Sequence, residues 1–217
     1  MNNNNNKLQV MEVVKILLPY LLSVADKVPC HDSQLQGSAY YKEIMETENV
    51  NRFKDVARMS KETFNLLLQE LCEKGLTSTE FVEAGEKLLI TMYVLAGNSN
   101  RNTQERFQHS GSSISSYVHE TIDTIVTLQE KYIKAPSVNT VPVHIRSNTK
   151  YYPYFKDCVG ALDGTHVSAS IPVKEQAPLC TCRGTICQNV LGVCDFNLKF
   201  TYVLVGWEGS AHDGQVL

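Results

Sequence analysis

The chain has 217 residues, of which 43% are hydrophobic and 20% are charged. This composition is that of an ordinary globular protein, and it argues against an intrinsically disordered chain. The length suits one domain, or a small helical domain followed by part of another. The net charge of −3 argues against a strongly basic nucleic-acid module, although a local basic patch is compatible with a nearly neutral total.

Residues 1–27 are predicted to form a tail and a helix. The tail is the low-complexity run Asn2–Asn6. The stretch Val10–Ala25 is apolar, but two charged residues and a proline interrupt it, so it lacks the run of about 18 residues that a membrane span needs. We therefore expect an amphipathic helix and no membrane association. Seven cysteines, an odd number, without a cleavable signal sequence predict free thiols in a reducing compartment.

Residues 28–133 are predicted to form a helical domain. Ser60 is a suitable N-cap for a first helix, and Gly75 stands where a left-handed C-cap belongs. A second helix is expected from about Thr79 to Gly97. Apolar residues repeat at helical spacing in both segments: Phe64, Leu67, Leu68, Leu71, Leu88, Leu89, Met92 and Leu95. These stripes indicate core packing.

The segment from Asn102 to Val126 has the pattern of a helix-turn-helix. Asn102 to Glu105 has capping-box spacing, the breaker His109–Gly111 follows, and Ser112 or Ser113 can start a longer helix. We expect an inward face made of Ile114, Tyr117, Val118, Ile122, Ile125 and Val126. The predicted DNA-binding side chains are Arg101, Arg106, Ser115, Ser116 and His119, together with Thr121. The same pattern is also compatible with a plain structural corner.

A change of pattern follows at residues 134–153. Three prolines and several polar residues predict an extended linker and a domain boundary. Residues 154–217 then read as strands: a short buried run ending at Asp163, a second run at Val190–Cys194 and a third at Phe200–Val205. Asp195–Asn197 between the last two runs predicts a hairpin turn. The expected fold class is therefore α+β.

Asp163 is the principal candidate catalytic residue, because it closes an apolar strand at a glycine. Asp163-Gly164 is also a common turn pair, and His166 beside it could be a ligand, a proton carrier or a surface residue. Asp213 fits the N-cap or the first turn of a helix, which is a structural role. Four cysteines near Cys180–Cys194 only partly meet zinc-ligand spacing.

Several strings of this chain resemble the PIF/Harbinger transposase family of HARBI-like nucleases. Tyr152–His166, which contains GALDGTH, is similar to the opening of the family's nuclease domain, and Gln188–Asp213 is similar to the segment that follows it. Val28–Ser33 and Arg52–Ser60 resemble its helical N-terminal region. Asn98–Gly111 resembles its helix-turn-helix segment. The resemblance extends from about Val28 to the end of the chain.

This resemblance implies a ribonuclease-H-like β-sheet that carries an Asp/Asp/Glu (DDE) triad around Mg²⁺ or Mn²⁺. Carboxylate oxygens suit such ions, and two ions can stabilise the attacking and leaving oxygens of a phosphodiester. Asp163 corresponds to the first acid of the triad, and Asp213 corresponds to a recurring acid that is only a weak candidate ligand. The resemblance also implies DNA association, a Myb-like protein partner and a nuclear location, with a cytoplasmic location as the alternative.

The chain departs from the family pattern in its cysteine-rich loop and after Asp213, where Gly214 replaces a frequent serine. The family's second acid and its glutamate belong to later segments that these residues do not match. We therefore expect a C-terminally truncated, incomplete nuclease domain over 154–217, with one triad acid and no activity by itself. The alternative is a non-catalytic DNA-binding or protein-interaction subunit.

Overall fold

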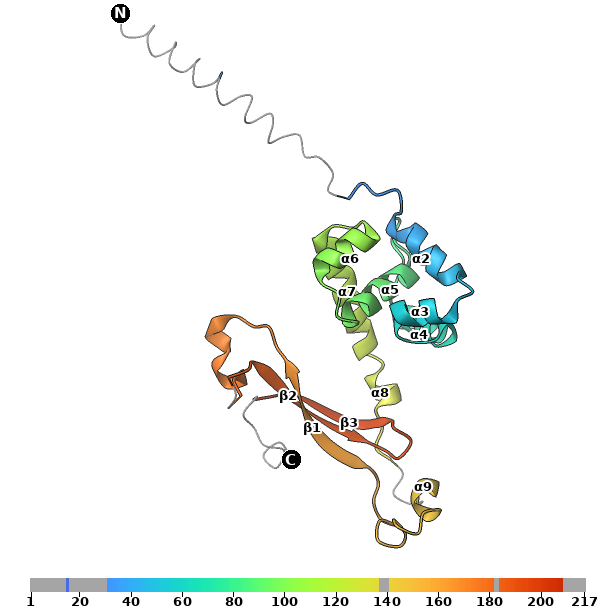
Figure 1. The fold of residues 1–217 in the computed structure, drawn as a ribbon, viewed down its shortest axis with the longest axis vertical. Helices are drawn as coiled ribbons and strands as arrows, with labels where there is room; N and C mark the ends of the chain where they lie inside the picture. Colours follow the sequence, from blue (N-terminus) through green and yellow to red (C-terminus); the bar gives the residue numbers. More distant parts are fainter. Residues whose placement is uncertain (1–14, 16–30, 137–140, 182–183, 209–217) are drawn as a thin grey trace, which may run out of the picture. The chain divides into compact units, whose positions relative to one another are not determined.

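The computed structural model describes residue 15 and residues 31–136, 141–181 and 184–208. The predicted α+β class is confirmed: helices come first, and a three-stranded antiparallel sheet follows (Figure 1). The chain divides into two compact units, residues 1–124 and 125–217, which are described separately below. Apart from Lys15, the predicted N-terminal tail and helix lie outside the described residues, as does Asp213.

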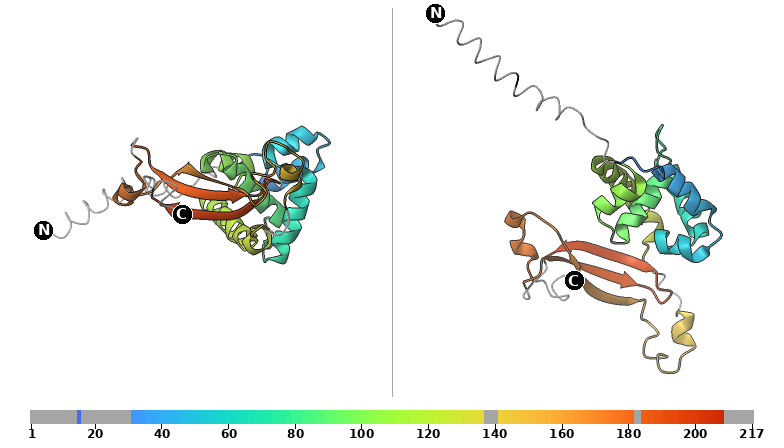
Figure 2. Two further views of the ribbon diagram at one scale, coloured as in Figure 1. Left: turned by 90° about the horizontal axis from the view of Figure 1, so that it is seen from below. Right: turned by 45° about the horizontal axis from the view of Figure 1, so that its top comes forward.

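The described part of the first unit, called the helical unit below, is built from helices without any strand. α5 contacts α2, α3, α4 and α6, so it is the centre of this unit (Figure 2). The helices in chain order are α2 (Gly37–Glu46), α3 (Val50–Ala57), α4 (Lys61–Glu73), α5 (Ala84–Leu95), α6 (Asn100–Phe107) and α7 (Gly111–Val126).

Local signals at both ends of α4 behave as predicted. The Ser60 hydroxyl accepts a hydrogen bond from the Thr63 amide at 3.2 Å, which satisfies one of the amide groups left unpaired at a helix start. At the other end Gly75 has a φ of 110°, and the amide of Leu76 donates to the carbonyl of Leu71. Glycine adopts this left-handed conformation without steric cost, so the helix ends in a Schellman motif.

Two predicted helix starts are wrong. α5 begins at Ala84 rather than near Thr79, because Thr79 instead bonds to Val82 within the preceding loop through both its backbone and its hydroxyl. α6 begins at Asn100, and its N-cap is Ser99, whose hydroxyl accepts from the Asn102 amide. The capping box predicted at Asn102 therefore does not form, because Asn102 already lies inside the helix.

The core of the helical unit is aromatic and aliphatic. Phe107 packs edge-on against both Tyr40 and Tyr93, and Phe53 packs edge-on against Phe64. Burial of each such side chain contributes about 1.5–3 kcal/mol relative to its exposure. The fully buried apolar side chains of this unit include Phe53, Phe64, Phe107, Ile44, Leu71, Leu76, Leu88, Leu89, Ile90 and Ile114.

The second unit, called the sheet unit below, contains short helices and the sheet. α8 (Gln129–Tyr132) and α9 (Val143–Arg146) precede the strands, so the predicted extended linker 134–153 is wrong where α9 forms. The strands are β1 (Ala161–Ser168), β2 (Cys187–Cys194) and β3 (Phe200–Trp207), in the order β1-β2-β3 with antiparallel pairing throughout. They lie side by side in every ribbon view (Figures 1 and 2).

The second and third strands and the turn between them match the prediction. The Asp195 carboxylate accepts from the backbone amides of Asn197 and Lys199 at 2.8 and 2.9 Å, and the Asp195 amide donates to the Lys199 carbonyl. The prediction for the first strand is wrong in two respects. Asp163 and Gly164 lie inside β1 rather than in a turn, and β1 is exposed along most of its length rather than buried.

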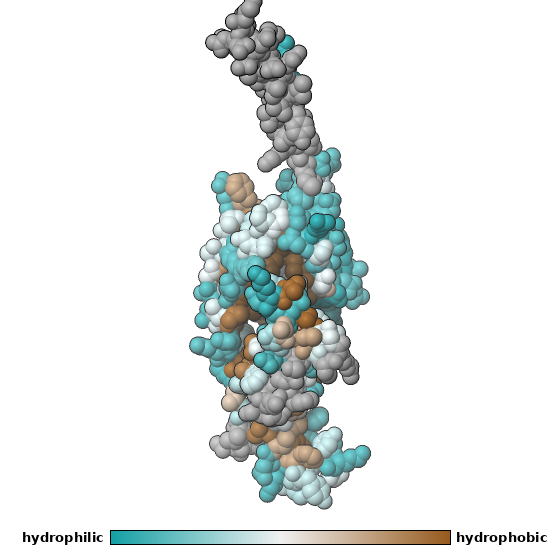
Figure 3. All heavy atoms as spheres, turned by 90° about the vertical axis from the view of Figure 1, so that its left-hand side faces the viewer, coloured by the Kyte–Doolittle hydropathy of each residue, from teal (hydrophilic) through white to brown (hydrophobic). Residues whose placement is uncertain are grey.

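The surface of the described residues is mixed in polarity. Brown apolar residues lie at the surface among teal hydrophilic ones in the space-filling view (Figure 3). Much of the exposed apolar area in the sheet unit comes from the strands themselves, as at Val167, Tyr202 and Val205. Within the part of the chain that the structure describes, no helix is both long and apolar enough to cross a membrane.

Candidate nucleic-acid interface and the position of Asp163

A three-residue turn joins α6 to α7. Gln108 ends α6 with a φ of 54°, and the Ser110 hydroxyl accepts from the Ser113 amide at 3.2 Å, which caps α7. The intervening His109 lies between these two capping positions. The sequence pattern of polar caps around a break therefore yields two helices joined by a short, well-defined turn.

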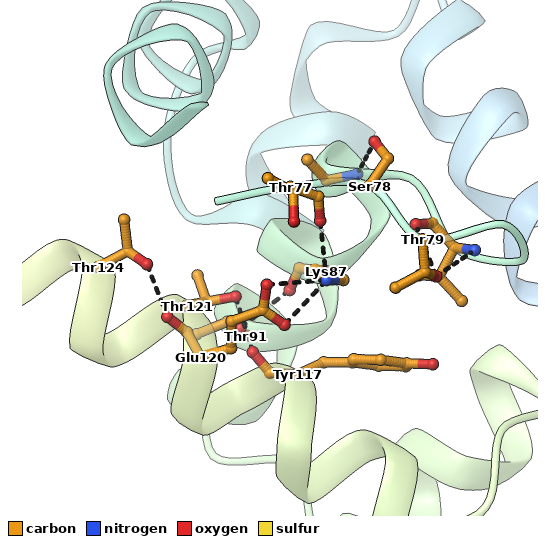
Figure 4. A network of polar contacts seen from close by, with 11 residues as sticks. Thr77, Ser78, Thr79, Lys87, Thr91, Tyr117, Glu120, Thr121 and Thr124 are labelled. Atoms are coloured by element: carbon orange, nitrogen blue, oxygen red, sulfur yellow. Dashed lines mark hydrogen bonds and ion pairs between the residues drawn. The ribbon is translucent and has the colours of Figure 1, made fainter. Parts of the chain in front are cut away.

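A buried lysine connects α7 to α5 (Figure 4). The side chain of Lys87 is only 2% exposed, and its Nζ donates to both carboxylate oxygens of Glu120 at 2.8 and 2.9 Å and to the Thr77 carbonyl at 2.8 Å. The same ammonium lies 5.5 Å from the centre of the Tyr117 ring. A buried cation is tolerated only when acceptors replace its water, so these contacts fix α7 against α5.

A buried glutamate holds the turn itself. Glu86 is fully buried, and its Oε1 lies 2.8 Å from Nε2 of His109. The His109 ring also meets Tyr117 edge-on, with the ring centres 5.9 Å apart. Glu86 Oε2 has no hydrogen-bond partner among the described residues. The Glu86–His109 contact thus attaches the turn to α5. It compensates for the lost hydration of only one of the two oxygens of Glu86.

Gly37, the first residue of α2, lies against this glutamate. A Cβ built on Gly37 would collide with Glu86 Oε1 and with the Phe107 carbonyl oxygen. α2, α5 and the end of α6 therefore approach one another at a point where only a glycine fits. This close approach places the N-terminal end of α2 beside the buried side chain of Glu86.

The predicted DNA-binding residues do not all share one environment. Arg101 and Ser116 are exposed, and Ser115 is half-buried. Arg106 is half-buried, with its guanidinium carbon 3.6 Å from the centre of the Tyr40 ring, so its planar face packs on the core. His119 is exposed, and its Nδ1 lies 2.6 Å from the Ser115 carbonyl.

Two side chains of α7 face the other way from the prediction. Thr121 was expected outside, but it is fully buried, and its hydroxyl donates to the Tyr117 carbonyl at 2.8 Å. The bond explains the error, because a threonine that satisfies its own hydroxyl within the helix can be buried cheaply. Val126 was expected inside, but it is 54% exposed.

The charge of the helical unit is unfavourable for binding to DNA. Residues 31–124 contain nine Lys/Arg and fourteen Asp/Glu, which gives a net charge of −5. α7 contains no lysine or arginine, and Asp123 is an exposed acid on it. Phosphate contacts on the α6–α7 surface therefore depend on Arg101 and on uncharged donors such as Ser116.

Asp163 lies on β1 opposite Gly192 of β2 and is exposed. One of its carboxylate oxygens, Oδ1, accepts a hydrogen bond from the Gly164 amide at 2.9 Å. His166 pairs with Asn189, three residues further along the strand. Because side chains alternate between the two faces of a strand, Asp163 and His166 lie on opposite faces and cannot share a metal ion.

The described residues do not fit a complete divalent-metal site. Among residues 31–136, 141–181 and 184–208, no group of three or more His, Cys, Asp or Glu side chains converges as metal ligands would. Three of the four cysteines whose spacing only partly suits zinc, Cys180, Cys187 and Cys194, are described and have free thiols. Asp163 alone would hold Mg²⁺ weakly, because that ion gives up its water reluctantly.

Sequence reasoning missed Glu86 and Lys87, the two residues that fix the turn and α7. One feature of the sequence could have revealed them: two adjacent residues of opposite charge directly precede the mostly apolar run that ends at Leu95. Charged residues are seldom fully buried unless they are paired, so a partner for each could have been sought nearby. The identity of those partners depends on the tertiary fold.

Comparison with known proteins gives one match. Residues 32–127, which include α2 to α7, match the family model described as a domain of unknown function (DUF8040). No curated protein and no solved structure matches the chain. The similarity therefore covers α2 to α7 and stops before the strands.

Proposed function

We propose that this chain is a transposase-derived nuclease homologue of the Harbinger type, which associates with DNA in the nucleus but does not cleave it alone. The resemblance in sequence supports this, as does the order of the two units, helices first and an antiparallel sheet second. The observation that carries the proposal is the α6–α7 turn, held by Glu86–His109 and Lys87–Glu120 while Arg101 and Ser116 stay exposed.

The association with DNA is expected to be weak and only mildly dependent on salt. Each phosphate neutralised on duplex DNA contributes a slope of about −0.9 in log K against log salt. Arg101 is an exposed cation of α6, whereas the face of Arg106 is committed to Tyr40. We therefore expect a slope between about −1 and −2.

Duplex retention by the full chain tests the first half of the proposal. Fluorescence anisotropy with a labelled duplex at low salt should show binding that Arg101→Glu and Ser116→Glu both weaken. Lys42→Glu is a matched control, because it makes the same change of charge as Arg101→Glu at an exposed position on α2. Equal binding by wild type, Arg101→Glu and Ser116→Glu would contradict the proposed interface.

A plasmid-nicking assay tests the second half. By the resemblance, Asp163 corresponds to one triad acid, and the implied Mg²⁺ or Mn²⁺ needs several carboxylates, which do not converge among the described residues. We expect no nicking of supercoiled plasmid by this polypeptide with either ion. Robust nicking that Asp163→Ala abolishes would show that a complete site exists.

A protein-interaction subunit is the second candidate, and the net charge of −5 on residues 31–124 favours it. Such a surface is complementary to a basic partner, and the resemblance implies a DNA-binding protein of the Myb type. Calorimetric titration with a basic Myb-like domain should then show salt-sensitive binding, while the chain alone shows no affinity for duplex DNA. Binding to DNA without binding to that domain would exclude this candidate.

A further inference from the structure

The sheet unit contains a groove with two walls. One wall is the end of α8 with the residues that follow it, and the other is the beginning of β3 with the turn before it. Its volume is about 690 Å³, and its walls include Lys131, Tyr132, Lys134, Asp195, Lys199 and Phe200. This volume lies within the range of roughly 300–1,000 Å³ that is typical of ligand sites. We call it the α8–β3 groove. All residues that line it belong to the sheet unit.

The α8–β3 groove is positively charged, unlike the helical unit. Lys131, Lys134 and Lys199 are exposed on its walls, and Asp195 is the acid that lines it with them. The Lys199 and Asn197 amides bond to the Asp195 carboxylate, and the Lys199 amide, the larger influence, lowers its pKa. The Asp195 carboxylate is therefore ionised, and it already accepts hydrogen bonds from backbone amides of the turn. The three lysines and Asp195 together carry a net charge of +2.

Exposed aromatic rings accompany the lysines. Tyr132 on one wall is 57% exposed, and Phe200 on the other is 59% exposed. The Lys131 ammonium lies 5.4 Å from the centre of the Tyr132 ring. Exposed aromatic side chains in a groove lined by cations are typical of sites that hold an unpaired nucleic-acid strand, in which bases stack on rings and phosphates meet lysines.

We propose that the α8–β3 groove binds single-stranded nucleic acid. Lys134 and Lys199 contact the phosphates, and Tyr132 and Phe200 provide stacking surfaces for bases. An acidic peptide would satisfy the lysines but would leave the two rings without a flat partner. A duplex offers phosphates but keeps its bases paired and stacked, so it cannot use the rings either. This site lies beyond the duplex-binding function proposed above.

The test uses the full chain and fluorescence anisotropy with a labelled oligothymidylate, compared with a labelled oligoglutamate peptide of similar charge. The oligothymidylate should bind more tightly, with a salt slope of about −1.4, because the two lysines on the phosphates each contribute about 0.7 on single strands. Tyr132→Ala and Phe200→Ala should each weaken its binding by about five-fold or more. Lys134→Glu combined with Lys199→Glu should abolish it.

Lys174→Glu is the matched control, because Lys174 is exposed in the same unit but does not line the groove. Circular dichroism and urea midpoints identify any variant that fails to fold, and Lys134→Gln then replaces the charge reversal. Equal binding by wild type and groove variants, or tighter binding of oligoglutamate, would overturn the proposal. Loss of duplex retention in Arg101→Glu with oligothymidylate binding intact would show that the two sites are separate.

Discussion

Two consecutive residues of α5 carry opposite charges into the interior of the helical unit, and each has a different partner. Lys87 meets Glu120 of α7, and Glu86 meets His109 of the turn. A buried pair contributes little to stability by itself, but the loss of one member is costly because the other keeps its charge without water. Single substitutions can therefore distinguish the effect of losing a charge partner from the effect of losing side-chain packing.

The first prediction concerns Glu120. Glu120→Gln should lower the free energy of unfolding by about 2–3 kcal/mol, because it leaves the Lys87 ammonium buried without its anion. Lys87→Met should cost less, because it leaves no buried charge. Urea unfolding measures both, and Asp123→Asn is the control, since Asp123 is an exposed acid on the same helix. A loss from Lys87→Met larger than that from Glu120→Gln would refute this account.

The second prediction concerns Gly37. Gly37→Ala should destabilise the helical unit by about 1–3 kcal/mol, because the new methyl group collides with Glu86 and with the Phe107 backbone. The cost should appear although alanine is the better helix former. Thermal or urea unfolding measures it against Ser38→Ala, the neighbouring position on α2. Unchanged stability in Gly37→Ala would mean that α2 can move away from α5.

The errors at single residues have a common physical cause. The helical pattern places the polar Thr121 outside and gives no role to Lys87, but each completes its hydrogen bonds in the interior. Burial of a polar group is determined by whether partners exist, and those partners come from residues 4 to 33 positions away. The partners of Lys87 lie on other segments of the chain, which a pattern along one helix does not show. For Thr121, the hydrophobic pattern ignores the bond that a threonine hydroxyl can make to a carbonyl of its own helix.

At the scale of elements, predictions from local capping and turn chemistry succeed at some positions and fail at others. Ser60 and Gly75 delimit α4 as expected, because capping needs only neighbouring residues. Asp163-Gly164 has equally strong turn chemistry but lies within β1. Pairing of Asp163 with Gly192 and of Gly164 with Leu191 in the neighbouring strand overrides the local preference.

The third prediction concerns the turn of the β2–β3 hairpin. The Lys199 amide, with a smaller effect from Asn197, lowers the pKa of Asp195. A lowered pKa means that the stabilisation is present above the unfolded-state value of about 3.9 and is lost as pH falls through the folded value. Asp195→Asn should therefore be less stable than wild type at neutral pH, and this difference should shrink in acid below about pH 3.9.

Amide hydrogen exchange in β2 and β3 across this pH range measures the effect. Asp157→Asn is the control, because Asp157 is an exposed acid outside the sheet. Parallel pH profiles for wild type and Asp195→Asn would show that the charge on Asp195 does not support the turn.

At the scale of the whole molecule, the sequence predicts helices followed by strands, and the structure confirms this order. The candidate metal site could not be predicted in the same way, because carboxylates converge only through strand pairing and helix docking. Alternation along β1 already separates Asp163 from His166, although the two are three residues apart in the chain. Proximity in sequence is therefore a poor guide to a shared ligand set.

The fourth prediction concerns self-association. Val167 on β1 is 51% exposed, and Val205 on β3 is 61% exposed, on strands that each have one unpaired edge among the described residues. Exposed apolar strands at a sheet edge favour intermolecular pairing. Light scattering should show association that grows with concentration and that Val167→Lys and Val205→Lys reduce. Val173→Lys, at an exposed position outside the strands, should leave it unchanged.

The adjacency of Glu86 and Lys87 also restricts how this segment can change in length. Each residue turns an α-helix by about 100°, so one inserted or deleted residue after Lys87 would rotate this charged pair away from the apolar run behind it. Substitutions along the exposed face of α7 do not change the rotational position of Glu86 and Lys87 on α5. Related chains are therefore expected to keep α5 free of insertions and deletions after the position of Lys87.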